Sequence, residues 1–216
     1  MKKPLIINLR GNSGSGKTFT TRAFMEKGTF HEDWYFPDET PEDEALLGGK
    51  AKGYLRGYVG AWQKKPFAIL GRYNNVCGGC DTIKTQEQII WRVEDYVKSG
   101  YNIWLEGLIL STIYGSVGEY SEKFGDRWVF AYLQPPIEEC IRRIQARRRA
   151  AGNLKPLNED NTRKRVATIE RNKQIVLGHG RRVVELDWRD PLPALLKIIR
   201  REGRFTYDRA RATSEC

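Results

Sequence analysis

Short apolar runs recur along the chain at spacings that suit buried strands alternating with helices. They predict five strands, at residues 5–9, 67–70, 102–105, 128–133 and 182–186. Between the strands, apolar positions recur at helical spacing, most clearly over 85–99, where Ile89, Val93 and Val97 share one face. Further helices are predicted at 18–27, 137–151, 160–177 and 193–201. Such alternation favours an α/β fold whose parallel sheet has helices on both faces.

Two segments depart from this alternation. Residues 29–65 are rich in acidic, glycine and aromatic residues, and we expect them to form an insert on the substrate side, with a small hairpin around 53–59. Residues 204–216 are polar and basic and are predicted to be a mobile tail. Residues 1–216 as a whole, these two segments included, are expected to form one domain, because the length suits a single α/β domain with insertions.

The charge balance favours an anionic partner. Lys and Arg number 37 against 27 Asp and Glu, giving a net charge of +10, and the excess lies in the second half. Nucleotide, nucleic acid or both would suit such a surface, and so would an ordinary solvated basic face. No apolar stretch approaches the roughly 20 residues that span a bilayer. The first predicted strand follows the N-terminus without room for a signal peptide, so a cytoplasmic protein is expected, without a membrane partner.

One motif identifies the cofactor class. After the first strand the chain contains the P-loop pattern G-x-x-x-x-G-K-[ST], and a helix is predicted to follow it. In such a loop, backbone N–H groups and the helix N-terminus bind phosphate oxygens, the lysine reaches the β- and γ-phosphates, and the hydroxyl ligates Mg²⁺. The residues expected to bind ATP here are Gly11, Asn12, Ser13, Gly14, Ser15, Gly16, Lys17 and Thr18. Lys17 is also expected to be catalytic.

Two carboxylates follow predicted strands. Glu106 ends the run 102–105, as a Walker B acid does, and is expected to organise Mg²⁺ with Thr18, directly or through water, or to act as base toward the acceptor. Asp81 lies in the loop after strand 67–70 and is the first candidate for general base. The alternative for Asp81 is a cap on the helix that begins near Thr85.

The loop that contains Asp81 is a candidate acceptor site. Its glycines would let a substrate approach the backbone closely, and it lies at the end of the sheet where ligands bind. The residues expected to contact substrate are Arg72, Tyr73, Gly78, Gly79 and Asp81. The same loop contains Cys77 and Cys80 at C-x-x-C spacing, which is half of a zinc site or a redox pair, but no second half is present in the sequence and reduced thiols are expected.

Arginines cluster after the fourth strand. Arg143 and Arg147 share a face of the predicted helix 137–151, and a second basic helix follows a short link. Two basic helices joined in this way predict a lid at 147–160 that closes over ATP, with its arginines balancing transition-state charge. Trp188, in the loop after the fifth strand, is a candidate for stacking on adenine, although packing alone would also explain it.

Together these segments resemble the P-loop kinase superfamily in its nucleotide-kinase-like branch. The resemblance implies a three-layer fold with a five-stranded parallel sheet in the order 2-3-1-4-5, an arginine-rich lid, and Mg-ATP as phosphate donor. Arg143-x-x-x-Arg147-Arg148 is similar to the lid entry of adenylate kinases, which implies stacking of Arg143 on the ATP base and contact of Arg147 with phosphates. A motif for the nucleoside monophosphate site of those enzymes is absent from the sequence.

A narrower resemblance suggests the acceptor. Gly71-Arg-Tyr, Gly78-Gly-Cys-Asp-Thr and Leu105-Glu-Gly together are similar to phage kinases that phosphorylate 5-hydroxymethyluracil in DNA. This implies a DNA substrate containing a modified base, and location in the host cytoplasm. Two alternatives stay open: a kinase for a free nucleoside, nucleotide or other small metabolite, and a DNA-stimulated ATPase or switch. The sequence leaves the oligomeric state undetermined.

Overall fold

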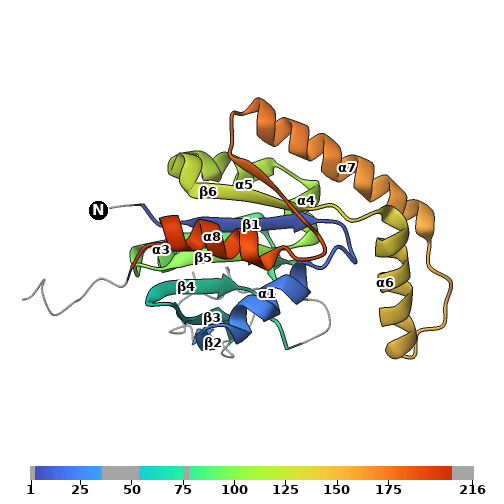
Figure 1. The fold of residues 1–216 in the computed structure, drawn as a ribbon, viewed down its shortest axis with the longest axis horizontal. Helices are drawn as coiled ribbons and strands as arrows, with labels where there is room; N and C mark the ends of the chain where they lie inside the picture. Colours follow the sequence, from blue (N-terminus) through green and yellow to red (C-terminus); the bar gives the residue numbers. More distant parts are fainter. Residues whose placement is uncertain (1–2, 36–53, 75–77, 206–216) are drawn as a thin grey trace, which may run out of the picture.

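The computed structural model describes residues 3–35, 54–74 and 78–205, and its centre is one mixed sheet (Figure 1). The strands follow the order β2-β3-β4-β5-β1-β6-β7. Their bounds are β1 Ile6–Gly11, β2 Thr29–Tyr35, β3 Tyr54–Trp62, β4 Lys65–Leu70, β5 Asn102–Glu106, β6 Trp128–Leu133 and β7 Val183–Leu186.

The prediction of a five-stranded, wholly parallel sheet was wrong in strand number and in strand direction. In the described part of the chain the sheet has seven strands, because β2 and β3 add to its edge in antiparallel pairing. The other five strands are parallel to one another. Numbered among themselves in chain order, these five follow the expected order 2-3-1-4-5.

Helices cover both faces of the sheet and make three layers (Figure 1). One face of the sheet packs against helices that follow β4, β5 and β6 in the chain, through residues such as Ile89, Leu110 and Val176. The opposite face packs against α1 and α8, through Phe24 and Leu195. The helices are α1 Lys17–Glu26, α3 Gln86–Lys98, α4 Leu108–Thr112, α5 Gly115–Tyr120, α6 Ile137–Ala150, α7 Glu159–Gly178 and α8 Leu192–Glu202, with 3-10 turns η1 Cys80–Thr82 and η2 Ser121–Arg127.

The expected insert extends the sheet. β3 and β4 form a hairpin, but its two-residue turn is Gln63-Lys64, both at positive φ, rather than in the expected region 53–59. β2 lies beyond β3, so Tyr35 and Tyr54 pair at the same end of the sheet as the carboxyl end of β4. The intervening residues 36–53 lie outside the described part of the chain, so a substrate-side role of this insert stays a prediction.

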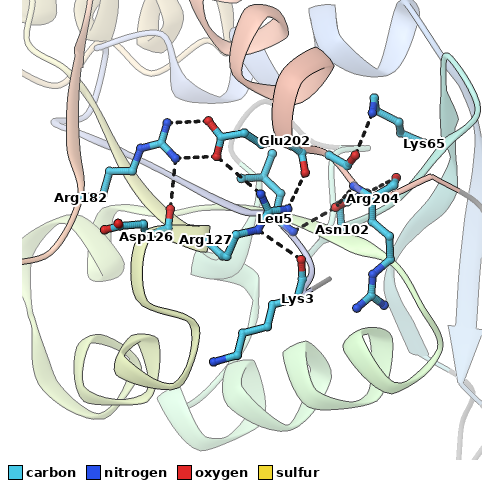
Figure 2. Close-up of polar contacts among 10 residues, drawn as sticks. Lys3, Leu5, Lys65, Asn102, Asp126, Arg127, Arg182, Glu202 and Arg204 are labelled. Carbon is cyan, nitrogen blue, oxygen red and sulfur yellow. Dashed lines mark hydrogen bonds and ion pairs between the residues drawn. The ribbon is translucent and has the colours of Figure 1, made fainter. Parts of the chain in front are cut away.

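A polar network lies at the amino ends of the parallel strands, the end of the sheet opposite the P-loop (Figure 2). The buried Asn102 side chain accepts hydrogen bonds from Leu5 N and Arg204 N at 3.0 and 2.8 Å. It donates to Pro66 O and Arg204 O at 2.9 and 3.0 Å. The expected tail therefore begins with an anchored residue, Arg204, while residues 206–216 lie outside the described part.

The same network ties the C-terminal helix to the sheet. Glu202, at the end of α8, receives two hydrogen bonds from Arg182, at 2.6 and 2.8 Å, and forms an ion pair with Arg127 (Figure 2). Bidentate pairing of this kind is the stronger form of an arginine–carboxylate contact. It fixes the sheet at the end away from the P-loop, which leaves the carboxyl ends of the strands for chemistry.

Candidate active site

The P-loop connects β1 to α1 directly. Gly14 and Gly16 have φ of 77° and 104°, and a Cβ on Gly14 would lie 2.5 Å from Cys140 O, so this position needs glycine. The Lys17 Nζ donates to Gly11 O at 2.7 Å and to Asn12 O at 3.0 Å. Burial lowers the pKa of Lys17, and Glu106 partly opposes this shift. The lysine is thus held inside the loop, where phosphate oxygens would replace the two carbonyls as partners.

Thr18 and Glu106 meet at the start of α1. The Thr18 hydroxyl donates a 2.9 Å hydrogen bond to Glu106 Oε1. Glu106 reaches this point because β5 pairs with β1 in a register that sets it beside Leu9. Burial raises the pKa of Glu106 to about 7, against the opposing effects of Lys17 and Thr18. A buried carboxylate beside a hydroxyl offers hard oxygen donors, the kind that Mg²⁺ prefers.

Asp81 caps a helix, though not the expected one. Its two carboxylate oxygens accept hydrogen bonds from Leu108 N at 2.8 Å and Ile109 N at 3.0 Å, at the N-terminus of α4. The helix that begins after Thr85 is capped by Thr85 itself, which accepts from Gln88 N. Asp81 therefore fixes the segment that follows Glu106, and its role as general base stays a prediction.

The Gly78-Gly79 turn lies directly on Glu106. Gly79 has φ of 73°, and a Cβ there would lie 2.8 Å from the Glu106 carboxylate. The turn is held by a hydrogen bond of 2.9 Å from Gly79 N to Arg72 O. The absence of a side chain at Gly79 is thus what allows the candidate acceptor loop to approach the candidate metal site.

Arg143 and Trp188 lie together beside the P-loop. The Arg143 guanidinium is 5.2 Å from the centre of the Trp188 ring, and its Nη1 is 3.4 Å from Gly14 O. Glu139, one helical turn earlier, holds Arg143 through a 2.6 Å contact. Two residues expected to contact the ATP base, far apart in the sequence, therefore lie together, while stacking on adenine stays a prediction.

The lid helices also touch the P-loop. Asn12 Nδ2 donates to Thr162 O in α7 at 3.1 Å, and α6 and α7 are joined by the Arg163–Glu138 ion pair. Residues 151–158 connect these helices, which places the expected lid between β6 and β7 (Figure 1). Closure of this segment over ATP stays a prediction.

A cavity of about 490 Å³ unites the site. Ten of the residues predicted to be functional line it: Asn12, Ser13, Gly14, Gly16, Lys17, Thr18, Gly78, Asp81, Glu106 and Arg147. Four further lining residues were not predicted from the sequence: Phe19, Arg22, Leu108 and Ile109. Arg22 follows Thr18 by four positions, so helical spacing could have suggested it, whereas Phe19 follows by one position and gave no such signal.

This geometry agrees with the similarity of the chain to known proteins. The chain is 32% identical over 164 residues to the 5-hmdU DNA kinase of Pseudomonas phage PaMx11, an alignment covering 75% of this chain and 79% of the relative. The chain belongs to the 5-hmdU DNA kinase family. The chain is also 29% identical over 209 residues to the 5-hmdU DNA kinase of Pseudomonas phage M6, an alignment covering 91% of this chain and 98% of the relative. No protein-family model matches the chain.

Solved structures with an overall likeness are more distant. A gluconokinase from Sinorhizobium meliloti 1021 aligns with a TM-score of 0.44 and 14% identity, over 91% of this chain and 90% of that one. A deoxyadenosine kinase from M. mycoides with bound dATP aligns with a TM-score of 0.43 and 14% identity, over 91% and 99%. At this distance neither informs the site.

Several residues expected in the site of this kinase lie behind it or at its border. The Tyr73 side chain is buried in the core against Tyr58, so it does not line the cavity. Gly11 and Ser15 are also buried and do not line the cavity. Arg72 is exposed and meets Gly79 through backbone alone, outside the cavity lining.

The cysteine loop has one described member. Cys80 is buried, and burial raises the pKa of its thiol, which keeps it protonated. Cys77 lies outside the described residues. Within the described residues no group of three or more His, Cys, Asp or Glu side chains is placed to hold a metal.

None of the described helices is both long and apolar enough to cross a membrane.

Proposed function

We propose that this kinase transfers the γ-phosphate of ATP to the hydroxymethyl group of 5-hydroxymethyluracil in DNA. The observation that carries the chemistry is the 2.9 Å contact between Thr18 and Glu106 at the mouth of the P-loop. The acceptor follows from the relatives named 5-hmdU DNA kinase. The net charge of +10 suits a polyanionic substrate.

The donor site fits Mg-ATP. Backbone N–H groups of the loop and Lys17 would bind the β- and γ-phosphates, and Thr18 with Glu106 would hold Mg²⁺, directly or through its water shell. The raised pKa of Glu106 supports this, because a buried carboxylate gains most from a nearby cation. When bound, Mg²⁺ supplies positive charge to the transferred phosphoryl group. Arg143 and Trp188 would flank the base of ATP.

The transfer itself forms one bond and breaks one. The hydroxymethyl oxygen bonds to the γ-phosphorus, the bond to the β–γ bridging oxygen breaks, and ADP leaves. Lys17 and Arg147 face the cavity and would stabilise the charge that spreads over the equatorial oxygens. The hydroxyl proton passes to Glu106 or to an oxygen of the transferred phosphoryl group. Because such transition states are loose, this proton leaves late and positioning dominates over base strength. Asp81 contributes by fixing α4 beside the acceptor.

Transfer of labelled γ-phosphate tests the proposal. We would offer a duplex containing 5-hydroxymethyluracil, the same duplex with thymine, and free nucleosides and nucleotides, with Lys17→Ala as the inactive control. Label on the modified duplex alone, absent with Lys17→Ala, is the expected result. Label on a free nucleoside would instead establish a metabolic kinase, and ATP hydrolysis without any acceptor would establish an ATPase.

A further inference from the structure

The cavity continues beyond the phosphate site into an apolar wall. Thr18 is followed by Phe19, and Glu106 is followed two and three positions later by Leu108 and Ile109. All three apolar side chains line the same cavity as the Thr18–Glu106 contact. Both elements that meet at the candidate metal site therefore present apolar surface immediately next to it.

Among the described residues, Phe19 does not contribute to the packing of the core. The side chain is 77% exposed and belongs to neither buried core cluster, and Ile109 is 43% exposed. ATP phosphates need N–H donors and cations, which the loop and Lys17 already offer, so an aromatic ring at this point does not serve the donor. Large exposed apolar groups that border a cavity are typical of ligand contacts.

The position of α4 is set by polar contacts. Asp81 accepts hydrogen bonds from Leu108 N and Ile109 N, which holds these two residues at the cavity. Arg22, one helical turn beyond Thr18, also lines the cavity and donates to Tyr73 O at 2.9 Å. The apolar wall is thus built on anchored backbone rather than on a free loop, and a cation lies at its border.

The chemistry of this wall points to a flat, uncharged ring. A sugar or polyol acceptor would need several hydrogen-bonding side chains, whereas a pyrimidine ring can stack on an aromatic side chain and contact aliphatic ones. A base inside a duplex must leave the stack before its substituent can reach a buried reactive site, and apolar side chains can then hold it. A base stacked on Phe19 would lie next to the Thr18–Glu106 contact, because Phe19 follows Thr18 directly and lines the same cavity.

We propose that Phe19, with Leu108 and Ile109, forms the platform that holds the extruded 5-hydroxymethyluracil base during transfer. This rests on the proposed function and adds the residues that select the acceptor. Phe19 is a specificity-determining residue, and the ATP site is independent of it.

Steady-state transfer to a duplex containing 5-hydroxymethyluracil tests this with Phe19→Ala, Phe19→Leu and Phe19→Trp. Stacking on aromatic side chains contributes enough that Phe19→Ala should raise KM for the duplex about tenfold or more. KM for ATP should change less than twofold, and Phe19→Trp should restore DNA affinity more fully than Phe19→Leu. Leu177→Ala, which removes a 44% exposed side chain of α7 outside the cavity, is the matched control and should leave both constants unchanged.

A second measurement is independent of turnover. A 2-aminopurine placed beside the modified base should brighten when wild-type protein extrudes that base, and should stay dim with Phe19→Ala. Equal KM values for the duplex in wild type and Phe19→Ala would overturn the platform. A parallel rise in both KM values would do so too, because it would indicate damage to the P-loop. Absence of transfer by wild type itself would instead refute the proposed function, on which the platform rests.

Discussion

The Thr18 hydroxyl donates a 2.9 Å hydrogen bond to Glu106 Oε1, joining two residues 88 positions apart in the chain. The contact exists because β1 and β5 are adjacent and parallel, so the P-loop and the carboxylate leave the sheet at the same end. Everything proposed for the site extends from this pair: the donor phosphates on the side of Lys17, and the acceptor on the side of Phe19.

Glu106→Gln should separate stability from activity. The pKa of Glu106 is about 7 in the folded protein, against an ordinary value of 4.5, so the folded state binds more protons than the unfolded state between these values. Its contribution to the free energy of unfolding therefore falls as pH rises from 4.5 through 7. At pH 8 the variant without ligand should be more stable than wild type, by on the order of 3 kcal/mol, with a smaller difference at pH 4.

Thermal unfolding of both proteins at the two pH values, with and without Mg²⁺ and ATP, checks this. Mg²⁺ with ATP should stabilise wild type more than the variant, and transfer by the variant should be at least ~10²-fold slower. A variant that is less stable than wild type at pH 8 would show that the ionised carboxylate is already well paired in the protein.

Asp81→Asn distinguishes a positioning residue from a base. Asparagine keeps one acceptor for the α4 N–H groups, so we expect kcat to fall less than about tenfold and KM for the DNA to rise, with the pH profile of kcat unchanged. The measurement is kcat and KM over a pH series. A loss of ~10²-fold or more with a missing acidic limb would instead assign Asp81 the role of general base.

Arg143→Leu should weaken ATP binding selectively. Arg143 contacts both Trp188 and Gly14 O, whereas its neighbour Arg142 pairs with the same Glu139 and touches neither. We expect KM for ATP to rise about tenfold with Arg143→Leu, in line with the loss of a cation–π contact near the ligand. Arg142→Leu is the control and should change it less than twofold. An equal rise in KM for ATP with both changes would indicate that each acts by disturbing helix α6 and not through contact with ATP.

Asn102→Leu should destabilise the fold without altering the site. The side chain makes four hydrogen bonds to backbone groups of three segments, and leucine would remove all four. A loss of about 3 kcal/mol in the free energy of unfolding is expected from urea titration. Asn153→Ala in the exposed lid loop should cost less than about 1 kcal/mol. Activity per folded molecule should stay at the wild-type level, since the network lies at the far end of the sheet.

Four of the five parallel strands, β1, β4, β5 and β6, were predictable because they are almost wholly buried and their sequences are therefore largely apolar. The fifth, β7, lies at an edge with only Leu186 buried, and its Val-Val-x-Leu pattern alone indicated a strand. The two antiparallel strands, β2 and β3, were not predicted. β2 is largely exposed and polar, and β3 contains Gly57, Gly60 and the buried Arg56, which interrupt any alternation. Arg56 is accommodated by Asp33, Asp95 and the Tyr96 ring, partners that only the folded chain brings together.

The site was predictable where the chemistry lies in a contiguous motif or a strand end, as for the P-loop and Glu106. The acceptor side was harder. Helix α4 is five residues long, too short for a periodic pattern, so Leu108 and Ile109 gave no signal. Tyr73 was expected to contact the substrate, but its ring packs in the core beside Tyr58. The sequence of the loop does not show which way this side chain points.

The identity of the phosphorylated atom tests the central claim most directly. A duplex with one 5-hydroxymethyluracil would be incubated with the kinase and Mg-ATP. The DNA would then be digested to nucleosides under conditions that leave a phosphate on the hydroxymethyl group intact, and the nucleosides would be analysed by mass spectrometry. The account predicts a nucleoside that has gained one phosphate on the hydroxymethyl group, and none with Lys17→Ala. Phosphate found only at the 5′ end of the strand, or a modified base that has gained none, would contradict it.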